Sequence, residues 1–107
     1  QYFNDFRQIV ETKYTKTRDA KAYAQDLFIS YKHLNNICKT VANQTAKRFI
    51  DNYIILEIKR KLAVTSLSIS EICYECGFDE PTNFVKYFKK HLSSTPIEFR
   101  EQFTRRD

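Results

Sequence analysis

Apolar residues recur along the chain at the spacing of an amphipathic helix, and no stretch alternates as a half-buried strand does. In the first segment Phe3, Phe6 and Val10 lie three and four residues apart. Polar residues 15–18 interrupt this stripe, and the longest one follows over residues 46–64. The periodicity predicts an all-α chain.

Helix boundaries are marked by residues that satisfy orphan backbone groups at helix ends. Asp19, Ser30 and Thr45 stand at predicted N-caps, and Asn43 stands at a predicted C-terminus because asparagine tolerates left-handed backbone. In the second half, the sequences Ser68-Ile-Ser-Glu and Thr95-Pro-Ile-Glu have capping-box spacing. Pro81 and Pro96 fall in first turns, where no N–H is needed. These signals predict seven helices.

A weak internal repeat covers residues 20–41 and 69–92, each with a short helix, a tight turn and a basic helix. This is the outline of a helix-turn-helix unit. Gly77, the only glycine, stands in the second turn, where positive φ is needed. Phe28 takes its place in the first turn and cannot adopt positive φ cheaply. We therefore expect the first turn to differ in shape from the second.

Composition excludes several classes of protein. One glycine and two prolines in 107 residues argue against turn-rich sandwiches and barrels, and a Gly-rich phosphate loop cannot exist. No apolar run exceeds four residues, so we expect no membrane span. No N-terminal secretion signal is visible, and the expected location is the cytoplasm.

The net charge of +5 favours polyanionic partners. Residues 27–50 and 82–96 contain lysine or arginine and no acid, whereas residues 68–81 contain acids and no base. This division indicates two separate basic contact surfaces, although solvated helix faces give the same pattern.

Nothing in the sequence indicates catalysis or a cofactor. Cys73-x-x-Cys76 has the spacing of a metal or redox pair, but no second pair accompanies it. We expect these cysteines and Cys38 to pack as small buried hydrophobes. No Ser/His/Asp set, paired carboxylate or metal-ligand spacing is present, so the chain is predicted not to be an enzyme.

The second half resembles the signature of the AraC/XylS family of bacterial transcription regulators. The matching residues are Ile69, Glu71, Ile72, Gly77, Phe78, Phe84, Phe88, Lys89, Thr95, Pro96, Phe99 and Arg100. The resemblance covers about residues 20–103, and departs from the family where Cys73 replaces a small residue and where Asn43 and Phe28 replace common glycines. It implies two helix-turn-helix subdomains joined by a long linker helix.

Residues 1–107 are accordingly expected to form one DNA-binding domain. Its predicted parts are the first helix-turn-helix at 19–42, the linker helix at 45–65, the second helix-turn-helix at 68–93 and a C-terminal helix at 96–104. A helix of about 19 residues spans roughly 28 Å, close to the roughly 34 Å between successive major-groove faces. We expect one chain to contact two adjacent major-groove segments.

Exposed residues near the start of each basic helix are predicted to contact base edges: Lys32, Asn35, Asn36, Thr82, Asn83 and Lys86. Asparagine pairs well with adenine and lysine with guanine. Phosphate contacts are predicted for Ser30, Lys39, Lys47, Arg48, Ser68, Lys89 and Lys90. Arg100 is expected to tie the last helix to the second unit.

The favoured function is sequence-specific binding of double-stranded DNA by a bacterial transcription regulator, as part of an activator. The alternative is a helical protein-interaction module whose basic faces bind an acidic partner. RNA polymerase is a further candidate partner, with Lys59, Arg60 and Lys61 as candidate contacts. Because the family's effector usually acts through another domain, we expect an effector-binding or sensor domain in the full-length protein, and no membrane partner.

Overall fold

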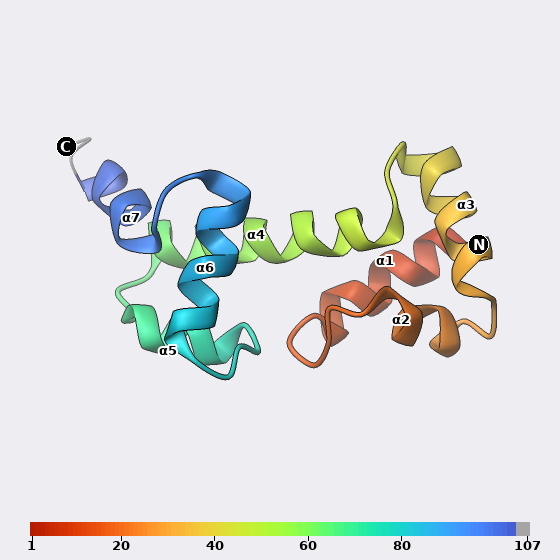
Figure 1. The fold of residues 1–107 in the computed structure, drawn as a ribbon, viewed down its shortest axis with the longest axis horizontal. Helices are drawn as coiled ribbons and strands as arrows, with labels where there is room; N and C mark the ends of the chain where they lie inside the picture. The colour runs from red at the N-terminus through yellow and green to blue at the C-terminus, as the bar shows by residue number, and fades with distance from the viewer. Residues whose placement is uncertain (105–107) are drawn as a thin grey trace. The chain divides into compact units, whose positions relative to one another are not determined.

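The computed structural model describes residues 1–104, which form seven α-helices and no strand (Figure 1). The helices are α1 (Tyr2–Lys13), α2 (Ala20–Asp26), α3 (Tyr31–Ala42), α4 (Ala46–Val64), α5 (Ile69–Glu75), α6 (Pro81–Leu92) and α7 (Pro96–Thr104). The all-α prediction is confirmed. The chain divides into an N-terminal unit, residues 1–54, and a C-terminal unit that begins at residue 55, and α4 contributes to both.

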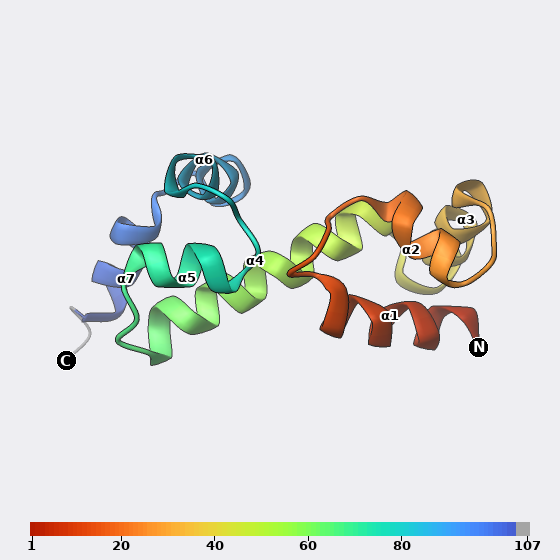
Figure 2. The ribbon, with the colours of Figure 1, turned by 90° about the horizontal axis from the view of Figure 1, so that it is seen from below.

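The N-terminal unit is built from α1, α2, α3 and the first half of α4. Figure 2 shows α1 running beneath α2 and α3. Phe6, Tyr23, Leu34 and Ile50 are fully buried at its centre. The ring of Phe6 lies 5.9 Å from that of Tyr23 and 5.4 Å from that of Phe49, so aromatic packing joins three of the four helices.

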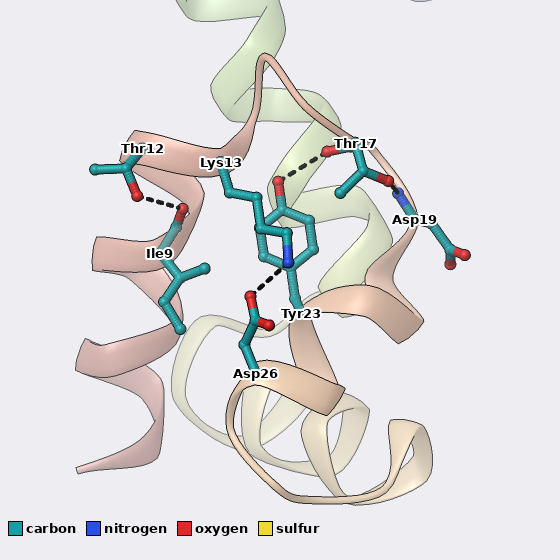
Figure 3. A network of polar contacts seen from close by, with 7 residues as sticks. All are labelled: Ile9, Thr12, Lys13, Thr17, Asp19, Tyr23 and Asp26. Carbon is teal, nitrogen blue, oxygen red and sulfur yellow. Dashed lines mark hydrogen bonds and ion pairs between the residues drawn. The ribbon is translucent and has the colours of Figure 1, made fainter.

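A polar network fastens α1 to α2 (Figure 3). The ammonium of Lys13 pairs with the carboxylate of Asp26, and it lies over the ring of Tyr23. The Tyr23 hydroxyl donates to the carbonyl oxygen of Thr17 at 2.8 Å. Burial, helped by the negative charge of Asp26, raises the pKa of Tyr23 to about 12. The hydroxyl therefore stays protonated and available as a donor at neutral pH.

The C-terminal unit packs the second half of α4 against α5, α6 and α7. Ile58, Ile72, Phe84 and Phe88 are fully buried in its core, and the rings of Phe88 and Phe99 lie 5.7 Å apart. Burial of such side chains contributes about 1.5–3 kcal/mol each relative to exposure.

Arg100 of α7 joins three carbonyl oxygens at the end of α4 and in the loop that follows. Its guanidinium donates from Nε to Leu62 at 3.0 Å, from Nη1 to Leu67 at 2.6 Å and from Nη2 to Thr65 at 3.3 Å. Leu62 lies in the last turn of α4, where carbonyl oxygens lack an intrahelical donor. Arg100 thus ties the last helix to the end of the linker helix and to the loop before the second helix-turn-helix, and a direct tie to residues 68–93 stays a prediction.

The predicted helix caps are formed. Asp19, Ser30 and Thr45 each accept a hydrogen bond from a backbone N–H in the first turn of the following helix. Asn43 ends α3 in the left-handed conformation, with φ 57°. Both predicted capping boxes have their two reciprocal bonds, at 2.8 and 3.0 Å in the first and 2.8 and 3.1 Å in the second.

The turn between α2 and α3 begins like the turn between α5 and α6, with a left-handed residue, but it has four residues between its helices, 27–30, where the second turn has five, 76–80. The expected difference in shape is therefore present as one residue of length, although Phe28 adopts the left-handed backbone that the sequence was expected to disfavour. Phe28 adopts φ 57°, and Gly77 adopts φ 88°. In each turn the following residue donates to a carbonyl five residues earlier at 3.1 Å, Ile29 to Ala24 in the first. The phenyl group of Phe28 is 95% exposed, so it clashes with no packed neighbour and the backbone bears only the intrinsic cost of the left-handed conformation.

The repeat also extends further than the sequence indicated. Helices α3 and α6 have 12 residues each and start 50 positions apart. From residues 32–49 to residues 82–99, the pattern of buried, half-buried and exposed positions coincides residue by residue. Each unit thus presents its second helix in the same local environment.

Candidate nucleic-acid interface

The outer faces of α3 and α6 carry most of the predicted DNA-contacting residues. Leu34 and Cys38 fix the orientation of α3 by burial, and Phe84 and Phe88 do the same for α6. Because a helix turns once in 3.6 residues, these anchors leave the opposite face of each helix in solvent.

In the N-terminal unit, Lys32, Asn36 and Lys39 are exposed along one face of α3, at steps of four and three residues. Asn35 lies on the same face but is half-buried, and its Oδ1 accepts a hydrogen bond from the N–H of Ala46 at 2.9 Å. Asn35 therefore joins α3 to the start of α4. Its contact with a base stays a prediction.

In the C-terminal unit, the structure brings together three of the predicted residues. Thr82, Lys86 and Lys89 surround a hollow of about 490 Å³, with Pro81, Val85 and Thr95 as the other lining residues. Asn83 and Lys90 are exposed but do not line it. Sequence reasoning missed Val85, although its place one turn from Thr82 and Lys89 was the signal that could have found it.

The predicted phosphate contacts differ in their surroundings. Lys39, Lys89, Lys90 and Arg48 are exposed, and none of the salt bridges among the described residues involves them. Lys89 is near enough to Glu98 for its charge to contribute to the lowered pKa of that carboxyl, after the hydrogen bonds from Thr95. Lys47 pairs with Asp51, at 2.9 Å between Nζ and Oδ1, so part of its charge is already neutralised.

The two predicted serine contacts are both N-caps. Ser30 caps α3, and the first turn of that helix contains no acid. Ser68 shares the start of α5 with the carboxylate of Glu71, whose pKa is lowered by the backbone N–H and hydroxyl of Ser68. A phosphate at that helix start would face a charge of its own sign, whereas the start of α3 has none.

An aromatic contact that was not expected from the sequence lies at the beginning of α3. The ring of Tyr2 meets the ring of His33 edge to face, with centroids 5.5 Å apart. This contact brings α1 to the first turn of α3, next to the predicted base-contacting residues.

Comparison with known proteins identifies the family. Residues 23–102 match the helix-turn-helix domain family. The probable transcription factor PqrA of Proteus vulgaris is 30% identical over 106 residues, which are 97% of this chain and 87% of PqrA. The chain belongs to the AraC type of helix-turn-helix regulators.

The solved structures agree with this AraC-type fold. A transcriptional regulator from Chromobacterium violaceum, described among AraC-type DNA-binding domain-containing proteins, superposes with a TM-score of 0.81. It is 20% identical, and the match covers 99% of this chain and 95% of that one. The two helix-turn-helix units and the linker helix are therefore the architecture of the family.

Some of the relatives are much longer than this chain. A histidine kinase of Formosa agariphila is 27% identical over 99 residues, which are 92% of this chain and 7% of the kinase. The chain also spans 34–36% of other curated relatives that it matches. PqrA, by contrast, is only slightly longer than this chain.

Family membership makes the chain a sequence-specific DNA-binding domain of a transcription regulator. The cysteines agree with packing roles, because burial raises the pKa of Cys38 and Cys76 to about 11 and also raises the pKa of Cys73. Over residues 1–104 no three His, Cys, Asp or Glu side chains are grouped to hold a metal ion. In the same range, no helix has the length and apolar character needed to cross a membrane.

Proposed function

We propose that α3 and α6 are recognition helices that enter successive major-groove segments of one duplex. The observation that carries this proposal is the repeated outer face, which has the same pattern of exposure in both units and contains no acid. Lys32 and Asn36 occupy on α3 the positions that Thr82 and Lys86 occupy on α6. Lysine donates to guanine O6 and N7, and asparagine bonds adenine at N6 and N7.

Contacts to phosphate are proposed for the remaining basic residues of these faces. Lys39 and Lys89 lie one turn beyond the proposed base contacts, and Lys90 and Arg48 add exposed charge beside them. The helix start at Ser30 offers backbone N–H groups without an acid nearby. For Asn35, Asn83, Lys47 and Ser68 we propose weaker contributions, since each is engaged within the protein or lies outside the hollow.

The test is a binding selection by this chain from a pool of randomised duplexes. We expect two enriched blocks centred about one helical turn, roughly 10 base pairs, apart. Lys32→Ala should relax preference within one block, and Lys86→Ala within the other, by about 1–3 kcal/mol each. Glu101→Gln, on the exposed side of α7, serves as a control outside both faces.

The selection has distinct negative outcomes. One enriched block would remove one helix from the proposal. Loss of affinity on every sequence alike in the lysine variants would show that these residues contact phosphate and not bases. The absence of any enrichment would overturn base recognition by both helices. Weak binding with low salt sensitivity and no preference for any duplex would favour the protein-interaction alternative.

Further partners are proposed from the family and from the length of the relatives. We propose that the domain acts as an activator that contacts RNA polymerase, and that in a longer protein an effector-binding or sensor domain controls it. Of the candidate polymerase contacts, Arg60 pairs with Glu57 at 2.8 Å and Lys61 with Glu75 at 3.1 Å. Transcription in a purified system from a promoter that carries the selected site tests activation. Binding to the chromosome would place the protein in the bacterial cytoplasm.

A further inference from the structure

Positions 35 and 85 are equivalent in the repeat, but the side chain at 35 accepts a hydrogen bond and the side chain at 85 lines a hollow. Asn35 accepts the N–H of Ala46, which is fully buried at the start of α4. The equivalent helix α7 starts with Pro96, which has no N–H to satisfy. The C-terminal unit therefore needs no polar side chain at this position, and Val85 occupies it.

Replacing the amide by a valine changes the surface between α6 and the start of α7. Val85 is half-buried, and with Pro81 and Thr95 it gives the hollow of about 490 Å³ a mainly apolar lining. Lys86 and Lys89 stand at its edge, and no acid lines it. An apolar floor flanked by two cations suits a ligand that is anionic overall and carries a small apolar group.

Double-stranded DNA has one group of this kind in the major groove. The 5-methyl group of thymine is the apolar feature by which an A·T pair differs from the other pairs there, and phosphates on either side supply the negative charge. We propose that Val85 is a specificity-determining residue and that the hollow receives a thymine methyl group. This inference rests on the proposed function, because it requires α6 to lie in the major groove.

The test removes the methyl group alone. In the selected duplex, each thymine of the block assigned to α6 by the Lys86→Ala variant is replaced in turn by deoxyuridine, and binding is measured by fluorescence anisotropy. At one position the substitution should weaken binding about threefold to fivefold, the effect of burying one methyl group. The Val85→Ala variant should bind the thymine and deoxyuridine duplexes equally at that position.

Val64→Ala is the matched control. It makes the same substitution at an exposed valine of the C-terminal unit that does not line the hollow. This variant should keep the full preference for thymine. Thermal unfolding of both variants, followed by circular dichroism, establishes that the comparison is between folded proteins.

The outcomes separate this inference from the function on which it rests. If the wild-type chain selects a sequence but no deoxyuridine substitution weakens binding, the hollow does not receive a methyl group and the recognition of DNA stands. The same conclusion follows if Val85→Ala keeps the preference for thymine. If the wild-type chain selects no sequence, the proposed function fails and this inference fails with it.

Discussion

Phe28 shows how a single residue can adopt a conformation that its type disfavours. A left-handed backbone costs a non-glycine residue about 1–2 kcal/mol. Phe28 nevertheless adopts this conformation, because Leu34 and Tyr23 anchor the helices on either side and its phenyl group extends into solvent. The steric cost of positive φ at a non-glycine residue could be predicted from the sequence. The packing of the two flanking helices, which holds Phe28 in that conformation, could not.

Replacing Phe28 by glycine should therefore stabilise the protein. The relief of left-handed strain exceeds the entropic cost of glycine, so we expect the free energy of unfolding to rise by about 0.5–1 kcal/mol. Urea denaturation measures the change. Phe28→Ala is the control, because it removes the same phenyl group and keeps the Cβ atom that causes the strain. Equal stabilities of the two variants would show that the backbone conformation is not strained.

At the scale of the element, most boundaries follow from local sequence. The caps at Asp19, Ser30 and Thr45 and both capping boxes involve partners within three residues, so a sequence pattern is enough to find them. The bond from Ala46 to Asn35 spans 11 residues and depends on how α3 and α4 pack. For that reason the sequence suggested only an exposed asparagine, and the hollow beside Val85 was equally invisible.

The hydrogen bond between Asn35 and Ala46 can be tested by transferring residues between the units. Asn35→Val leaves the buried N–H of Ala46 without an acceptor, and we expect a loss of about 1–3 kcal/mol in the free energy of unfolding. Adding Ala46→Pro removes that N–H and reproduces the pair found in the C-terminal unit. The double variant should recover part of the loss in urea denaturation. A double variant less stable than Asn35→Val would contradict the equivalence of the two positions.

The capping boxes predict how stability depends on acid. Hydrogen bonds from the backbone and hydroxyl of Ser68 lower the pKa of Glu71 below 4.5, and those of Thr95 do the same for Glu98. A carboxyl whose pKa is lowered by folding stabilises the protein above its unfolded pKa, and this contribution disappears as the pH falls through the folded pKa.

We therefore expect the melting temperature of the wild-type chain to fall between about pH 5 and about pH 3. The double variant Glu71→Gln and Glu98→Gln should have a lower melting temperature at neutral pH, and that temperature should fall less than the wild-type value between these two pH values. Glu101→Gln, which lies outside both boxes, should follow the wild-type curve. A double variant with the wild-type dependence would mean that other carboxyl groups control acid unfolding.

For the whole molecule, charge should control affinity more than specificity. The chain carries a net charge of +5, and each phosphate that a lysine neutralises steepens the salt dependence of binding by about one unit. Lys39→Ala and Lys89→Ala should each weaken binding to every duplex and reduce the slope of log K against log salt by about one. Lys16→Ala, on the exposed connection after α1, should leave the slope unchanged. An unaltered slope in Lys89→Ala would remove that residue from the phosphate contacts.

Whole-molecule organisation was predictable where it depended on recurring local patterns. Two helix-turn-helix units and a linker helix followed from periodicity, caps and the signature around Gly77. The residue-by-residue match in burial between 32–49 and 82–99 could not be predicted, because the two segments have few identical residues at equivalent positions. Burial depends on tertiary packing, and the sequence alone suggested no more than a weak repeat.

The repeat within one chain has a consequence for promoters. A symmetric dimer places two identical faces on DNA and therefore recognises a palindrome, which looks the same from either side. Here the equivalent positions carry Lys32 in one unit and Thr82 in the other, and Asn36 in one and Lys86 in the other. With the proposed function, the operator is asymmetric and has a direction. A promoter can thus set which end of the regulator faces the start of transcription by the orientation of one short sequence.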